Sequence, residues 1–311
     1  DAILLSIPSN YSGSSLKYFE DTSAGMGYVK YENGWTRLDS YFNIDITPPI
    51  YSSISDTGIV AIDSYVYEKN LGNWIQKGSD LGGRKYTSLS NNGLTIAVFE
   101  SSTVVKVFDW SNENWLQRGS DIVNPSSDPW SGASWMKYFK ISGNGNVVVI
   151  GDYTYPSGSR IYVYEWNGSS WVTVTPFPWT DTTSGGSNRL GQDMDLSEDG
   201  NMIIASGLHV GPRIWKRVGN SYQESFNGIP ASGGAGINNL VCGSISQDGL
   251  SVALVNAPYS SATTQNNFIQ VISYDVVLST WSQKGLTIPV TYIRGYVSHP
   301  SYTSLFLDTD G

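Results

Sequence analysis

The stretch ISGNGNVVVIGD, residues 141–152, places the turn Ser142-Gly143-Asn144-Gly145 between two extended runs of the chain. Asn-Gly between alternating and apolar residues is a strong signal for a β-hairpin, because Gly adopts a positive φ without steric cost. The same turn recurs, and its other copies are SDTG (55–58), SNNG (90–93), SEDG (197–200), SQDG (246–249) and a looser SNYSG (9–13). The chain is therefore predicted to repeat one hairpin-rich unit.

Two further strands are predicted to complete each unit. The third carries an aromatic residue followed by a carboxylate, at Tyr31-Glu32, Tyr67-Glu68, Phe108-Asp109, Tyr164-Glu165 and Tyr274-Asp275; RIWKRV (213–218) departs from this pattern with basic residues. The fourth begins with Trp35, Trp74, Trp115, Trp171 and Trp281, with Tyr222 in the sixth copy. Three copies share a longer phrase: WIQKG (74–78), WLQRG (115–119) and WSQKG (281–285).

The spacing of the tryptophans predicts the fold. From Trp35 to Trp281 the unit recurs with a period of about 49 residues, and four short strands in such a period are typical of a β-propeller blade. No long run has the spacing of apolar residues that an amphipathic helix requires. We therefore expect an all-β propeller of four-stranded antiparallel blades, in which the tryptophans fill the layers between blades.

We expect residues 1–311 to form a single propeller domain. The predicted blades lie at approximately 1–38, 39–79, 80–120, 121–175, 176–226 and 227–285, with a partial seventh at 286–311. Residues 293–298 and 304–308 are predicted to form the first two strands of that seventh blade. The alternative is a six-bladed ring closed by overlapping terminal strands.

Composition excludes some classes of partner. The net charge is −9, and the 18 Lys and Arg residues are scattered, whereas nucleic-acid binding requires clustered basic residues. No apolar run has membrane-spanning length, so we expect neither nucleic-acid binding nor membrane insertion. The single cysteine, Cys242, allows no intramolecular disulfide and is expected to be a buried core residue.

The combination of the turn, the VxVYE-like strand and W-x-Q-K/R-G resembles propeller repeats of the FG-GAP or WD40-like plan, such as those of uncharacterised surface and structural proteins of marine microbes and their viruses. This resemblance implies the fold and supplies no catalytic residues. FG-GAP repeats often bind calcium through a DxDxDG loop, which the turns here do not match. We expect no cofactor; the one candidate pair of calcium ligands is Asp308 and Asp310.

Residues suited to catalysis are few. His209 and His299 lie in a predicted loop and a predicted turn, and neither has a partner at metal-ligand spacing. Asp193 and Asp195 alternate along a predicted strand, so both point to one side. They fit either a polar strand face or the acid pair of a glycan-processing enzyme. We expect a protein that is not an enzyme.

Loop aromatics are the candidate binding residues. The connections at 121–135, 152–159 and 175–188 are predicted to emerge on one face, and they carry Trp130, Trp135, Tyr153, Tyr155, Phe177 and Trp179. Such aromatics suit either sugar stacking or a protein contact, or they fold down and cap the ring. The sequence thus favours a non-catalytic interaction module in an extracellular or particle-surface setting, such as a virion, a fibre or a cell surface. Its expected partners are other proteins; a carbohydrate-binding propeller and a glycan-processing enzyme are the alternatives.

Overall fold

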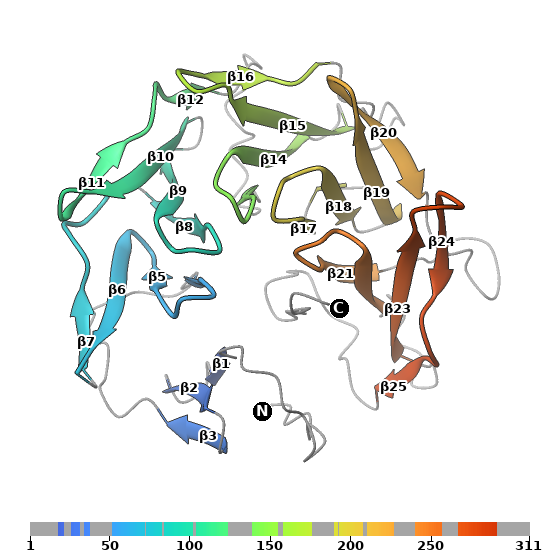
Figure 1. The fold of residues 1–311 in the computed structure, drawn as a ribbon, viewed down its shortest axis with the longest axis horizontal. Helices are drawn as coiled ribbons and strands as arrows, with labels where there is room; N and C mark the ends of the chain where they lie inside the picture. The colour runs from blue at the N-terminus through green and yellow to red at the C-terminus, as the bar shows by residue number, and fades with distance from the viewer. Residues whose placement is uncertain are drawn as a thin grey trace.

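The computed structural model describes fourteen segments of the chain, namely residues 18–21, 26–31, 34–37, 52–71, 73–82, 84–101, 104–123, 139–154, 158–175, 190–191, 193–207, 210–226, 240–256 and 267–290. These segments contain strands and turns and no helix. The strands form six antiparallel sheets, which follow one another around a common centre in chain order (Figure 1). The protein is an all-β propeller, as the sequence predicts.

The sheets are named here as blades A to F. Blade A contains β1 (Tyr18–Asp21), β2 (Met26–Tyr31) and β3 (Gly34–Arg37). Blade B contains β4 (Ser52–Ile54), β5 (Val60–Ile62), β6 (Tyr65–Asn70) and β7 (Asn73–Gln76). Blade C contains β8 (Arg84–Leu89), β9 (Thr95–Ser101), β10 (Val104–Ser111), β11 (Asn114–Gln117) and β12 (Ile122–Val123).

The later blades have the same plan. Blade D contains β13 (Phe139–Ile141), β14 (Val147–Thr154), β15 (Gly158–Trp166) and β16 (Trp171–Thr173). Blade E contains β17 (Asp193–Leu196), β18 (Met202–Gly207), β19 (Val210–Val218) and β20 (Ser221–Phe226). Blade F contains β21 (Leu240–Ile245), β22 (Ser251–Asn256), β23 (Asn267–Asp275), β24 (Thr280–Gln283) and β25 (Ile288–Val290).

Within each blade the strands pair in sequence order, so every blade is a meander. In blades B to F the first strand lies nearest the centre and the fourth lies at the rim (Figure 1). Two short strands are added: β12 pairs with β10, and β25 pairs with β23. The residues predicted to begin a seventh blade, 293–298 and 304–308, lie outside the described residues, so the blade number and the blade boundaries stay predictions.

The repeated turn explains why the unit recurs. In blade D the buried hydroxyl of Ser142 accepts the N–H of Val147 at 2.9 Å and donates to Oδ1 of Asn144 at 2.8 Å. Gly145 has φ +74°, and a Cβ there would lie 2.9 Å from the Cβ of Thr95 in blade C. The turn therefore closes its own hairpin and also packs against the preceding blade. The equivalent serines, all buried, are Ser55, Ser90, Ser197 and Ser246.

The hydrophobic core lies between blades. Four clusters of buried residues join blades B and C, C and D, D and E, and E and F. The second strands are rich in apolar residues on both faces because neighbouring blades cover both faces; every residue of β18 is buried. This accounts for the apolar runs that follow each turn, since a blade alone would leave both faces in water.

The strand register differs from the predicted alignment in two blades. Tyr67 and Phe108 pair with Gln76 and Gln117, whereas Tyr274 of blade F pairs with Trp281. The residue of blade F that matches Tyr67 is therefore Ile272, which pairs with Gln283, and the Tyr274-Asp275 pair lies two residues further along. In blade A, Tyr31 pairs with Gly34 and is likewise displaced. The alignment of these two aromatic–carboxylate pairs was wrong because the matching residues, Tyr28 and Ile272, are not followed by an acid, and an aromatic–acid pair lies two or three residues further along.

Candidate functional site

Tryptophans on the fourth strands hold neighbouring blades together. The indole Nε1 of Trp115 in blade C donates to the carbonyl oxygen of Lys77 in blade B at 2.7 Å, and Trp171 in blade D donates to that of Arg118 in blade C at 2.8 Å. In blade F, Trp281 donates to the hydroxyl of Ser225 in blade E at 3.0 Å. These contacts confirm the prediction for Trp115, Trp171 and Trp281, which lie between neighbouring blades.

The phrase W-x-Q-K/R-G forms the receiving side of this contact, called here the acceptor segment (residues 74–78 in blade B, 115–119 in blade C and 281–285 in blade F). In blade B, Gln76 donates to the carbonyl of Gly78 at 2.9 Å, and Gly78 has φ +77°. A Cβ on Gly78 would lie 2.8 Å from the rings of both Trp110 and Trp115. Lys77 lies 4.2 Å from the centroid of the Trp110 ring, a favourable cation–π distance.

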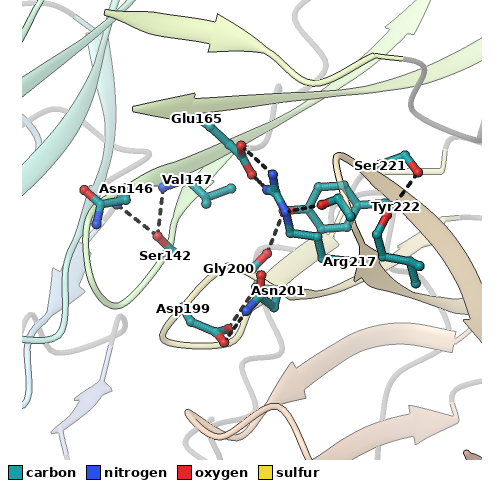
Figure 2. Close-up of polar contacts among 12 residues, drawn as sticks. Ser142, Asn146, Val147, Glu165, Asp199, Gly200, Asn201, Arg217, Ser221 and Tyr222 are labelled. Atoms are coloured by element: carbon teal, nitrogen blue, oxygen red, sulfur yellow. Dashed lines mark hydrogen bonds and ion pairs between the residues drawn. The ribbon is translucent and has the colours of Figure 1, made fainter. Parts of the chain in front are cut away.

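The contact between blades D and E is built differently. At the position of Lys77 and Arg118, blade D has the buried Val174, whose N–H bonds the third strand as theirs do. Arg217 of blade E reaches the other way, and its Nη2 donates to Oε2 of Glu165 in blade D at 2.9 Å. Figure 2 shows the Arg217 guanidinium between Glu165 and Tyr222. Tyr222 donates to the carbonyl of Gly200 in its own blade at 2.7 Å.

Asp193 and Asp195 on β17 both point toward blade F. Oδ2 of Asp193 accepts the N–H of Gly243 at 2.7 Å, and Oδ2 of Asp195 accepts both the N–H of Ile245 and the hydroxyl of Ser244 at 3.1 Å. Burial raises the pKa of Asp193 to about 7, although the Gly243 N–H and the charge of Lys140 oppose the shift. These acids therefore connect two blades through backbone groups.

The repeated turns line the centre of one face of the propeller. Backbone hydrogen bonds link the turns of successive blades, each from an N–H group to a carbonyl oxygen. The N–H of Asp56 donates to Asn91, that of Asn91 to Gly143, that of Asn144 to Glu198, and that of Glu198 to Gln247. The side chain of Gln247 in blade F hydrogen-bonds Asp56 in blade B. The turn carboxylates Asp199 and Asp248 accept hydrogen bonds inside their own turns.

The turn between the third and fourth strands of blade F is apolar, unlike the corresponding turns of blades C to E. Val276, Val277 and Leu278 are 62, 87 and 70% exposed. The corresponding turns of blades C, D and E contain Asn112-Glu113, Gly168-Ser169-Ser170 and Gly219-Asn220, and that of blade B contains a single exposed aliphatic residue, Leu71. We call residues 276–278 the aliphatic turn. By strand direction this turn emerges on the same face as the repeated turns.

The backbone of the aliphatic turn is held by the side chain of Asp275. Oδ1 of Asp275 accepts the N–H of Val277 at 2.8 Å and that of Leu278 at 2.9 Å, an Asx-turn. Ser279 completes the turn with φ +54°. The exposed side chains are thus presented from an ordered backbone. Sequence analysis missed this feature; the available signal was three consecutive aliphatic residues at a position where three other blades have Gly, Asn, Ser or Glu.

Most predicted binding residues lie outside the described residues. These are Trp130, Trp135, Tyr155, Phe177 and Trp179, together with the candidate calcium ligands Asp308 and Asp310 and both histidines. Tyr153 lies in β14, where its backbone pairs with Ser159. Cys242 lies in β21, opposite Val255. The predicted aromatic surface therefore stays a prediction.

Within the described segments, no three His, Cys, Asp or Glu side chains are grouped so that they could hold a metal ion. No helix in the same segments has the length and apolar character needed to cross a bilayer.

Comparison with known proteins identifies the fold. No family model and no curated protein matches the sequence, so the FG-GAP or WD40-like resemblance stays a prediction. Among solved structures, TolB from Acinetobacter baumannii has 14% identity and a TM-score of 0.48; the match covers 92% of this chain and 66% of that one. A proposed 6-phosphogluconolactonase from Bacteroides uniformis has 12% identity and a TM-score of 0.52, covering 89% of this chain and 84% of that one. Likeness at this level of identity shows the propeller fold alone.

Proposed function

We propose that this protein is a non-catalytic interaction module that binds a partner protein through the aliphatic turn of blade F. A propeller provides a rigid frame whose turns and loops vary independently of the core, so function is assigned from a site on the frame. The setting we propose is an exposed surface, extracellular or on a particle. The polar, weakly charged composition supports that setting.

The observation that carries the proposal is the ordered exposure of Val276, Val277 and Leu278. Covering exposed aliphatic side chains lowers the free energy by about 25 cal/mol for each Å² of apolar surface removed from water. A tip that is already ordered by Asp275 loses little conformational entropy when a partner covers it, so binding retains more of the hydrophobic gain. A partner with an apolar recess matches this turn.

The environment of the carboxylates supports a non-catalytic assignment. A glycan-processing site needs two acids that face a substrate with different proton affinities. Asp193 and Asp195 instead face blade F and accept its backbone N–H groups. Asp199 and Asp248 are engaged inside the turns that they stabilise.

Affinity capture with turn variants tests the proposal. The protein would be immobilised as wild type, as Val277→Asp/Leu278→Asp, and as Ser169→Asp/Ser170→Asp in the exposed polar turn of blade D. We expect one set of proteins to be retained by the wild type and the blade D variant and to be lost with the blade F variant. Equal retention by all three would contradict the proposal, provided that their melting temperatures agree.

A further inference from the structure

One register position of the third strand holds a carboxylate in blades B, C and D, beside the following blade. Each carboxylate is paired with a basic side chain: Glu68 with Lys77, Asp109 with Arg118, and Glu165 with Arg217. In blade E the same position holds Lys216, which pairs with Gln223 across the hairpin as Glu165 pairs with Val172. The boundary between blades E and F therefore has a cation where the three preceding boundaries have an acid and a base.

Lys216 has no counter-charge in the part of the chain that the structure describes. Its Nζ donates to the hydroxyl oxygen of Tyr274 in blade F at 3.3 Å and lies 4.8 Å from the centroid of that ring. None of the ion pairs among the described residues includes Lys216. The residue is only partly buried, so a group at the surface can approach it.

Tyr274 connects Lys216 to the aliphatic turn. It lies two residues before Val276, on the strand that enters the turn. A hydrogen bond with Ser279, at the end of the turn, is the main cause of the lowered pKa of the Tyr274 hydroxyl; burial opposes this shift, and Lys216 adds to it. Val218, which is 47% exposed, lies two residues beyond Lys216 and therefore on the same face of β19. The cation is thus accompanied by aliphatic side chains of both blades.

A partner that covers the aliphatic turn also removes water from Lys216. Taking an ammonium group out of water without a counter-charge costs free energy, and a carboxylate supplied by the partner offsets that cost. No ion pair of the protein has to be broken first, unlike at Lys77 or Arg118. The surface therefore discriminates against partners that are apolar alone.

We infer that the aliphatic turn and Lys216 form one binding surface, whose partner presents a carboxylate at the edge of an apolar recess. This inference rests on the proposed function and specifies the chemistry of the partner. The occupant is a segment of another protein in which Asp or Glu lies beside the residues that line the recess. The recess covers Val277 and Leu278, and the carboxylate meets the Nζ of Lys216.

Selection from a random peptide library displayed on phage tests the chemistry of the partner. The full chain would be immobilised, and bound phage would be counter-selected on Val277→Asp/Leu278→Asp, so that only peptides that need the turn are kept. We expect the kept peptides to contain Asp or Glu next to apolar residues. Turn-dependent peptides without acids would overturn this inference and leave the proposed function standing. A library that yields no turn-dependent peptide would contradict both.

A lysine variant identifies the group that meets the carboxylate. An enriched peptide and its acid-to-amide analogue would be titrated by fluorescence anisotropy against the wild type, Lys216→Met and Lys106→Met. Lys106 in blade C is paired with Glu100, so Lys106→Met is the control with the same change in net charge. We expect the amide to bind about tenfold more weakly than the acid to the wild type and to Lys106→Met, and as tightly as the acid to Lys216→Met. A difference that persists in Lys216→Met would overturn the inference.

A measurement on the wild type does not depend on the folding of a variant. Acylation of lysine amines would be followed residue by residue by mass spectrometry, with and without a saturating concentration of the acid peptide. We expect the peptide to slow the reaction of Lys216 and to leave that of Lys106 unchanged. A rate at Lys216 that is the same with and without the peptide would contradict the assignment.

Discussion

Arg217 of blade E forms an ion pair with Glu165 of blade D across the boundary between the two blades. Arg217 pairs with Tyr222 across the hairpin of blade E. Arg217 thus takes the position that Trp110 occupies in blade C and Trp166 in blade D. In those contacts the basic residue belongs to the preceding blade. Here the preceding blade has Val174 at that position, and the following blade supplies the cation. The change in RIWKRV therefore compensates for the missing basic residue in blade D.

Removing the carboxylate of Glu165 is expected to destabilise the fold. Glu165 and Arg217 are 20 and 23% exposed, so Glu165→Gln leaves a largely buried guanidinium without its counter-charge, at a cost of about 2 kcal/mol in the free energy of unfolding. Glu100→Gln, which breaks the more exposed pair with Lys106, is the control and should cost less than about 1 kcal/mol. Denaturant titration of Glu165→Gln, Arg217→Met and the double variant measures the coupling energy between the two residues; a coupling energy near zero would contradict this assignment.

The buried turn serine is expected to be costly to remove. Ser142→Ala leaves the N–H of Val147 and Oδ1 of Asn144 without the hydroxyl that they share, at about 2 kcal/mol. Ser169→Ala, in an exposed turn, should change the free energy of unfolding by no more than about 0.5 kcal/mol. Equal effects in urea unfolding would mean that the turn hydroxyl is not a structural group.

The indole N–H of Trp115 is expected to contribute separately from its ring. Trp115→Phe keeps an aromatic ring on Gly78 but leaves the carbonyl of Lys77 without its donor, which should cost about 1–3 kcal/mol. Leu116→Phe at the neighbouring exposed position serves as the control and should be near neutral. If Trp115→Phe were equally neutral in a thermal melt, the hydrogen bond between the blades would not matter for stability.

Asp193 is expected to make stability depend on pH. Its pKa in the folded protein is about 7 because of burial, whereas an unfolded Asp has a pKa of about 3.9. Between these values the folded protein binds a proton that the unfolded chain releases, so the free energy of unfolding falls as pH rises from about 4 to about 7. Asp193→Asn still accepts from Gly243 and cannot ionise.

The Asp193→Asn variant should therefore melt above the wild type at pH 8, with the difference closing toward pH 4. Glu113→Gln, in an exposed turn, removes one negative charge without burial and is the control for net charge. A difference between Asp193→Asn and the wild type that does not vary with pH would show that Asp193 ionises normally.

The local parts of the fold could be predicted from the sequence because they depend on short spacings. The S-x-x-G turns, the apolar second strands and the tryptophan period specify the blade. The register of blade F could not be predicted in this way, because Tyr274 is aligned by pairing with Trp281 across a turn longer than those of blades B, C and E. The register of β23 is set by its pairing with β24 and not by the position of the aromatic–carboxylate pair.

Contacts between blades were less accessible to sequence reasoning. Glu165 and Arg217 are 52 residues apart, and only the ring places them together. The phrase W-x-Q-K/R-G was visible as a repeat, but its role as a receiving site follows from the carbonyl of Lys77, which accepts the Trp115 indole N–H, and from the close approach of the Trp110 and Trp115 rings to Gly78. The sequence pattern favoured the loop aromatics Trp130, Trp135 and Trp179, which lie outside the described residues, and did not indicate the aliphatic turn.

Site-specific photo-crosslinking tests the proposed function most directly. A benzophenone amino acid would replace Val277 in one sample and Ser169, in the exposed turn of blade D, in the other; both would be irradiated in the same native extract. We predict that one defined protein is crosslinked at position 277 and not at 169, and that prior addition of unlabelled wild type suppresses it. Crosslinking that is absent at 277, or equal at the two positions, would contradict the assignment of the aliphatic turn as the binding surface.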